Sequence, residues 1–208
     1  MRSAVRTLAD LGEGLVLAPE RWVASGADDE GVPLGELVVE RRERASAADA
    51  VVLDTTHARD GLLDLPAALR ASAPARSTKK LARAGDLVVS RLRPYLRQIA
   101  LVHPRALEAT GGRPLALSTE FYVLAPRREG EDLSFLLPFL LGDRAQALLA
   151  AAQEGGHHPR VPRSVVLDLR VPERVVRSRR RLSARASGVL DAIYAAMSRY
   201  QALLTDAS

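Results

Sequence analysis

Short apolar runs, separated by charged or turn-forming residues, dominate the first two thirds of the chain. Five runs are brief, rich in β-branched residues and bounded by Gly, Pro or charge: residues 32–39, 50–56, 87–90, 99–102 and 120–124. Runs of this length and content are typical of β-strands. A sixth run, residues 165–171, ends at Pro172 and indicates a last strand. The pattern predicts a β-containing core with strands that pair over long sequence distances.

A different pattern covers residues 133–153, which are rich in Leu and Ala and have apolar residues on most faces. This predicts a buried helix or a helix pair. The interruption is expected near Pro138, because proline removes a helical hydrogen bond and clashes with the preceding turn. Gly155 and Gly156 end the segment.

The clearest pattern lies at the C-terminal end. Apolar residues there alternate in spacing between four and three, which is a heptad repeat formed by Leu182, Ala186, Val189, Ile193, Ala196, Tyr200 and Leu203. The stripe is widened on one side by Leu190, Met197 and Leu204. We expect a helix from about Glu173 to Thr205, on the order of 45 to 50 Å long at 1.5 Å per residue. So long a stripe needs a partner, because a small domain cannot cover it.

These patterns define an α+β fold class: a β-containing domain with packed helices over residues 1–172, followed by one long coiled-coil-type helix over residues 173–208. The 208 residues are 47% apolar, which suffices for one domain with an appendage. The longest strongly apolar stretch, Leu133 to Leu141, is far short of the roughly 20 residues of a membrane helix. The N-terminus lacks a sustained apolar region, so no secretory signal is expected. A cytoplasmic protein without membrane contact is the prediction.

Composition excludes several kinds of chemistry. Cysteine is absent, so disulfides, thiolate metal sites and a cysteine nucleophile are ruled out, in agreement with a reducing compartment. There is no Gly-x-Ser-x-Gly nucleophile elbow, no phosphate-binding Gly-x4-Gly-Lys, no His-Glu-x-x-His and no Asn/Asp-Pro-Pro-Tyr/Phe motif. We therefore expect no catalytic residue, no metal and no cofactor, and a protein that is not an enzyme.

Positive charge is concentrated in two segments. Residues 76–105 hold eight Lys or Arg against one acid, and residues 160–185 hold nine Arg against two acids, whereas the net charge of the whole chain is only +5. Two basic segments on an acidic body indicate a polyanionic partner, because neutralised phosphates release counterions. Nucleic acid is the favoured partner, and anionic lipid is the weaker alternative.

Arg91, Arg93, Tyr95 and Arg97 are the first candidates for contact with DNA. If the strand continues past Ser90, they alternate onto one face; Pro94 favours a turn instead, and either geometry presents them outward. Arginine can bind guanine with two hydrogen bonds, and tyrosine can stack or contact a phosphate. The alternative is a solvated basic face.

A second group of candidates follows Gly155 and Gly156. His157, His158 and Arg160 form a loop with donors for phosphates or base edges, and the alternative is an ordinary solvated loop. Metal binding is disfavoured, because adjacent histidines point in different directions and no third ligand is near. Contacts to the DNA backbone are expected from Arg76, Lys79, Lys80 and Arg163.

Four motifs, in this order, resemble one half of a type I restriction-modification specificity subunit. They are Val32-Pro-Leu-Gly-Glu-Leu37, Ala84-Gly-Asp-Leu-Val-Val-Ser-Arg-Leu-Arg-Pro94, Ser118-Thr-Glu-Phe-Tyr-Val-Leu124 and Gly155-Gly-His-His-Pro-Arg-Val161, followed by the heptad helix. The resemblance runs from about Val32 to the C-terminus. In that family a target recognition domain reads one part of a bipartite DNA site. A long helix separates it from a second copy and docks methyltransferase subunits.

The resemblance implies a sequence-specific DNA-recognition subunit of a restriction-modification or phage-defence complex. Its implied partners are double-stranded DNA, a separate adenine methyltransferase subunit and, as a further candidate, a restriction nuclease subunit. This chain has one recognition domain and one helix where the family has two of each. Antiparallel self-association would restore the pair and would predict a palindromic split target. The expected interface is formed by Leu182, Ala186, Val189, Ile193, Met197, Tyr200 and Leu203.

Two alternatives remain at this point. A non-catalytic scaffold of a defence complex would bind DNA without regard to sequence. A small nuclease with an unrecognised metal site is the less favoured alternative.

Overall fold

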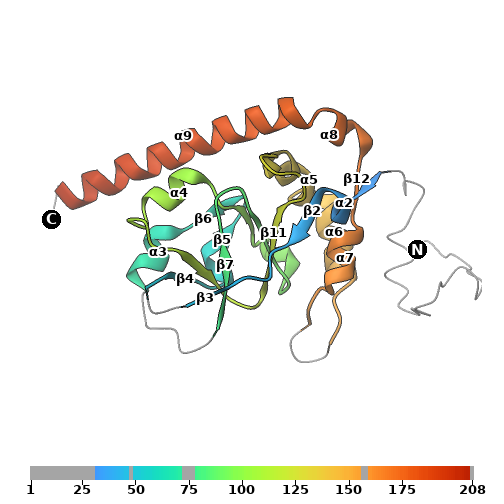
Figure 1. Cartoon of the computed structure of the whole chain (residues 1–208), viewed down its shortest axis with the longest axis horizontal. Helices are drawn as coiled ribbons and strands as arrows, with labels where there is room; N and C mark the ends of the chain where they lie inside the picture. The colour runs from blue at the N-terminus through green and yellow to red at the C-terminus, as the bar shows by residue number, and fades with distance from the viewer. Residues whose placement is uncertain (1–30, 47–48, 72–77, 156–158, 207–208) are drawn as a thin grey trace, which may run out of the picture.

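The computed structural model describes residues 31–46, 49–71, 78–155 and 159–206. Within them, Figure 1 shows a body of strands and short helices with one long helix, α9, lying along it. The strands are β1 Val32–Pro33, β2 Val38–Glu40, β3 Arg44–Ala45, β4 Val51–Leu53, β5 Ala58–Arg59, β6 Leu62–Leu63, β7 Lys79–Ala82, β8 Leu87–Ser90, β9 Ile99–Leu101, β10 Leu115–Leu117, β11 Phe121–Pro126 and β12 Arg170–Val171. The helices are α2 Leu34–Leu37, η2 Thr55–His57, α3 Leu65–Arg70, η3 Pro94–Leu96, α4 Pro104–Glu108, η4 Leu133–Leu136, α5 Leu137–Leu140, α6 Asp143–Ala151, α7 Arg163–Asp168, α8 Glu173–Arg177 and α9 Arg179–Asp206. The α+β fold class with a long C-terminal helix is thereby confirmed.

Two four-stranded sheets form the body, in the orders β3-β7-β10-β4 and β2-β11-β8-β9. All pairs in them are antiparallel except β10 with β4. Strands β8 and β9 are buried along their whole length, which explains their continuous apolar sequences. In Figure 1 the labelled strands β3, β4 and β7 lie on the side of the body away from α9.

The predicted strands are confirmed at 87–90, 99–102 and 120–124, where β8, β9 and β11 form. The run 32–39 is instead divided by α2, and the run 50–56 gives β4 followed by η2. The predicted last strand over 165–171 is wrong, because most of it belongs to α7, and only β12 is extended. Pro162 precedes α7 at its N-cap, with φ −61, and leads directly into the helix. Strands β7 and β10 and helices α3 and α4 were not predicted.

The helix pair over 133–153 is confirmed, but its break is not at Pro138. That proline lies in the first turn of α5, where its missing N–H has no helical partner to lose. The chain turns at Gly142, the N-cap of α6. A Cβ there would lie 3.1 Å from the carbonyl oxygen of Pro138, so a larger residue would require the turn to shift by a few tenths of an ångström.

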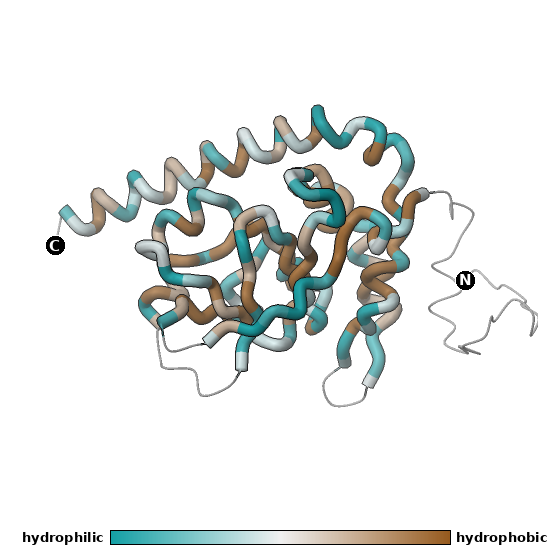
Figure 2. The backbone as a smooth tube through the Cα atoms, viewed as in Figure 1, coloured by the Kyte–Doolittle hydropathy of each residue, from teal (hydrophilic) through white to brown (hydrophobic). Residues whose placement is uncertain are grey.

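The apolar residues of this pair contribute to the core. Leu133, Phe135, Leu136 and Leu140 are buried, and Figure 2 shows hydrophobic segments gathered inside the body. Among the described residues no single helix has the length and apolar content to cross a membrane. By those two criteria one bent pair does, Leu133–Leu140 with Asp143–Ala151, which meet at 72°.

The Gly85-Asp86 motif has a structural role. Gly85 has φ +85, a conformation that favours glycine, and it turns the chain from β7 into β8. The buried carboxylate of Asp86 accepts hydrogen bonds from Arg41, at 2.7 and 2.9 Å, and from the backbone N–H of Arg83, at 2.8 Å. Because a buried charge is costly without partners, this pair fixes the turn.

Helix α9 is tied to the body along one face. The hydroxyl of Tyr194 accepts a hydrogen bond from the backbone N–H of Leu63 at 2.9 Å, and its ring stacks on His103 at 5.4 Å. Nε of Arg105 donates to Asp191 at 2.7 Å. Leu190 and Tyr194 belong to the same buried cluster as the body. Burial raises the pKa of Tyr194, against the opposing effect of its hydrogen bond with Leu63.

The expectation that the body is too small to cover the tail holds for one face only. The inner face of α9 packs on the body, whereas Val189, Tyr200 and Leu203 are exposed. The predicted single helix from 173 is divided at Ser178 into α8 and α9. The 28 residues of α9 span about 42 Å at 1.5 Å per residue. The domain division at residue 172 remains a prediction.

Candidate nucleic-acid interface

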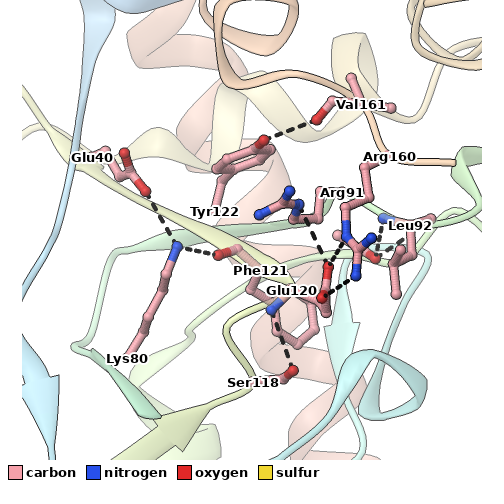
Figure 3. Close-up of polar contacts among 11 residues, drawn as sticks. Glu40, Lys80, Arg91, Leu92, Ser118, Glu120, Phe121, Tyr122, Arg160 and Val161 are labelled. Carbon is pink, nitrogen blue, oxygen red and sulfur yellow. Dashed lines mark hydrogen bonds and ion pairs between the residues drawn. The ribbon is translucent and has the colours of Figure 1, made fainter. Parts of the chain in front are cut away.

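Four of the predicted DNA-contacting cations pair with two carboxylates, Glu40 and Glu120, and we call Lys80, Arg91, Arg160 and Arg163 the cation cluster. Lys80 comes from β7, Arg91 follows β8, and Arg160 and Arg163 flank the start of α7. Figure 3 shows three of these cations, with Tyr122 between Lys80 and the two arginines and with the carboxylates of Glu40 and Glu120. The fold therefore joins the two basic segments of the sequence at one place.

Glu120 holds two members of the cluster. Nε of Arg160 donates to Oε2 at 3.0 Å and Nη2 donates to Oε1 at 2.8 Å, so the ion pair is bidentate. Nε of Arg91 lies 3.4 Å from Oε2 of the same carboxylate. The hydrogen bond to Glu120 raises the pKa of Arg160 above its ordinary value. This carboxylate therefore fixes the direction of Arg160 by two hydrogen bonds and attracts Arg91 by charge.

Glu40 holds the other two members. Its side chain is only 9% exposed, and its carboxylate lies 2.7 Å from Nε of Arg163 and 3.2 Å from Nζ of Lys80. Nζ of Lys80 also donates to the carbonyl oxygen of Phe121 at 2.7 Å. Two carboxylates thus serve four cations, which leaves the cluster positive but ordered.

Tyr122 forms the platform between the two halves of the cluster. Nζ of Lys80 lies 5.6 Å and Cζ of Arg91 lies 5.9 Å from its ring centroid, within the range of cation–π attraction. Its hydroxyl donates to the carbonyl oxygen of Val161 at 2.8 Å. Burial raises the pKa of Tyr122, while the charge of Arg91 acts in the opposite direction.

Backbone hydrogen bonds explain this arrangement. Tyr122 lies in β11 and Glu120 lies in the turn directly before it, while the side chain of Phe121 between them is buried in the core. The backbone N–H of Arg91 donates to the carbonyl of Glu120 at 2.9 Å, and that of Val161 donates to the carbonyl of Arg91 at 2.8 Å. Three distant segments are therefore joined by backbone hydrogen bonds before any side chain is considered.

The segment after Arg91 is a turn, so the strand geometry considered for it is wrong and the turn favoured by Pro94 is confirmed. Arg93 and Arg97 flank η3 with φ 44 and 50, a left-handed conformation that is uncommon outside glycine. Tyr95 between them is 68% exposed. Arg97 pairs with Asp143 at 2.8 Å. Backbone strain of this kind gathers at functional sites.

Four further candidates remain, and the structure describes only Lys79 among them. Arg76, His157 and His158 lie outside the described residues. Lys79 begins β7 and pairs in register with Ala45. Among residues 31–46, 49–71, 78–155 and 159–206, no group of three His, Asp or Glu is placed to hold a metal ion.

Three residues of this site were not among the predicted contacts: Glu40, Glu120 and Tyr122. The spacing of Glu120 and Tyr122 in a predicted strand was a usable signal, because residues two apart share a face. Nothing in the sequence indicated that Glu40, eighty residues earlier in the chain than Glu120, would lie beside the same ring.

The predicted protein-interface residues divide between two faces of α9. Leu182 and Met197 pack against the core of the body, and Ala186 is partly buried. The others form what we call the outer stripe, with Val189 59%, Tyr200 60% and Leu203 66% exposed. Ile193 and Ala196 of this stripe line a shallow hollow of the helix surface. The outer stripe is formed by Val189, Ile193, Ala196, Tyr200 and Leu203.

The architecture places the chain in a class: a mixed α+β domain followed by one long helix. Two of the solved structures that are similar to it belong to type I R-M systems. One is the HsdS subunit from Thermoanaerobacter tengcongensis, with 24% sequence identity and a TM-score of 0.50, where the match covers 85% of this chain and 46% of that one. The other comes from work on the assembly and conformational transition of the type I R-M system, with 23% identity, a TM-score of 0.52 and the same coverage.

These likenesses confirm the predicted resemblance at the level of the fold. The chain spans about half the length of the structures that it matches. No protein-family model and no curated protein matches the sequence.

Proposed function

We propose that the chain is a non-catalytic, sequence-specific DNA-recognition subunit of a type I-like restriction-modification or phage-defence complex. The observation that carries the proposal is the cation cluster. Its four cations come from distant segments, yet carboxylates and a tyrosine ring hold them at one place on an HsdS-like fold. Ordered guanidinium groups suit the reading of base edges, which needs fixed direction as well as charge.

In this proposal α9 mediates assembly of the complex. A second copy of the chain, packed antiparallel against the outer stripe, would give two recognition domains related by a two-fold axis. Such a pair would read a palindromic split target. A separate adenine methyltransferase subunit would act on that target, with a restriction nuclease subunit as a further partner of the complex.

Selection from a random duplex library by the purified chain tests the proposal. The expected result is enrichment of a split palindrome, with protection of the same bases in footprinting. Equal binding to all sequences would overturn it in favour of a scaffold. Magnesium-dependent cleavage by the chain alone would also overturn it, in favour of a nuclease.

A pair of double variants connects this result to the cluster. Arg160→Ala with Arg163→Ala should weaken binding to the selected duplex at least tenfold and reduce its dependence on salt, because phosphate neutralisation governs that dependence. The control is Arg128→Ala with Arg199→Ala, which removes the same charge from two exposed positions outside the cluster. Equal losses in the two double variants would contradict the assignment of the cluster.

A further inference from the structure

The side chain of Arg91 is held by groups of the chain itself. Its Nε is buried and makes no hydrogen bond, but it forms an ion pair with Glu120 at 3.4 Å, and its Cζ lies 5.9 Å from the ring centroid of Tyr122. Its backbone N–H and carbonyl are engaged by Glu120 and Val161. Arg91 is therefore oriented before any ligand arrives, and little side-chain freedom remains to be lost on binding.

The opposite edge of the same guanidinium is differently placed. Nη1 and Nη2 make no hydrogen bond within the described part of the chain, and the side chain is 34% exposed. That edge presents two parallel N–H donors. Two parallel donors match the N7 and O6 acceptors that guanine presents in the major groove.

We propose that Arg91 reads a guanine through this edge, and that Glu120 is the positioning residue that favours base reading over phosphate binding. This rests on the proposed function. A guanidinium without a neighbouring acid is attracted to every phosphate, whereas the carboxylate of Glu120 offsets the charge and repels phosphate. Binding is then favourable only where a directional pair of acceptors meets the donors.

Arg93 provides the contrast within the same segment. It is exposed on the adjacent turn and has no ion pair in the described ranges. It is suited to phosphate, which carries no sequence information directly. Two arginines two residues apart are thus assigned different tasks because only one of them is tied to a carboxylate.

The experiment is library selection with the full-length chain and four variants. Arg91→Lys keeps the charge but loses the paired donors, so it should lower the preference for guanine at one position by about tenfold or more. Glu120→Gln should reduce the same preference and raise affinity for unrelated duplex severalfold at low salt. Arg93→Ala should weaken binding to all sequences alike. Glu129→Gln, an equal change of charge on an exposed loop, should leave the selected sequence unaltered.

The possible failures are distinguishable. If the unaltered chain selects a sequence and both Arg91→Lys and Glu120→Gln select it with the same preference, the inference is overturned and the proposed function stands. A melting temperature is measured for every variant. If Glu120→Gln lowers it and weakens all duplexes in equal ratio, Glu120 is only structural and its positioning role is overturned. If the unaltered chain selects nothing, the proposed function itself fails.

Discussion

The cation cluster and the outer stripe of α9 are both open surfaces, but their groups are satisfied differently. Every cation of the cluster has a carboxylate within 3.4 Å, so each one has an ionic partner in the free chain, although two cations share each carboxylate. The outer stripe has large apolar side chains that are more than half exposed, among them Tyr200 and Leu203. The cations of the cluster therefore have partners within the chain, whereas the apolar side chains of the outer stripe are left in contact with water.

This difference separates two kinds of binding. Paired charges can exchange an internal partner for a ligand at small net cost, which suits a reversible contact that must discriminate. Exposed apolar area is stabilised by any lasting cover, because its burial removes water from both sides. We therefore expect the outer stripe to govern assembly, and the cation cluster to govern selection among DNA sequences.

The largest effect should follow from a charge on the outer stripe. Ile193→Asp would bury an unpaired carboxylate between copies, which should weaken self-association by about 3 kcal/mol, roughly a hundredfold. Light scattering should then give the mass of one chain. The control is Ala202→Asp, which places the same charge at an exposed position of α9 off the stripe. An unaltered mass for Ile193→Asp would show that the outer stripe does not govern assembly.

A smaller effect is expected inside the cation cluster. Glu40→Gln removes the carboxylate that serves Lys80 and Arg163, and the free energy of unfolding should fall by about 2 kcal/mol because that carboxylate is almost fully buried. Urea unfolding measures it, with Glu129→Gln as the control. Equal stability of the two variants would show that the cluster is not internally satisfied.

The inner face of α9 provides the next test. Tyr194→Phe leaves the backbone N–H of Leu63 without its acceptor, so the free energy of unfolding should fall by about 1 kcal/mol. Tyr200→Phe makes the same chemical change at an exposed position and should alter the stability by less than about 0.5 kcal/mol. Denaturant unfolding of the two variants compares the faces directly, and equal losses would contradict the assignment of an inner and an outer face.

The smallest effect on stability is expected at the tip of the exposed turn. Tyr95→Ser should leave the free energy of unfolding within about 0.5 kcal/mol, because the ring is 68% exposed. The same change should weaken DNA binding by roughly threefold if the ring stacks on a nucleotide. Thermal unfolding and a binding titration check the two parts, and a loss of stability without a loss of affinity would assign the ring to the fold.

Local sequence patterns were sufficient to predict several of the strands and the long helix. Strands β8, β9 and β11 and the long helix were predicted because their apolar residues repeat with a period that geometry dictates. Helix α7 was missed because Val165 to Leu167 are apolar and β-branched in part, and only the preceding Pro162 favours a helix. Strands as short as β3 or β12 have too few residues for any period to be visible.

The candidate site was likewise predicted only in part. The sequence identified the cations, because their clustering is a one-dimensional property. It did not identify their partners: Glu40 lies in β2 and Glu120 lies in the turn before β11, and only the pairing of β2 with β11 brings them near one ring. For the same reason the heptad repeat predicted an apolar stripe on α9, but it did not predict that Leu182 and Met197 would pack against the core of the body.

The left-handed residues beside η3 restrict how this tip can diverge among relatives. At positions 93 and 97 the backbone tolerates Gly, Asn or Asp readily and β-branched residues poorly, whatever the bound molecule requires. Tyr95, between them, has ordinary geometry and faces water. New target preferences should therefore arise by exchange at position 95 far more often than at either flank, with the loop's shape inherited unchanged.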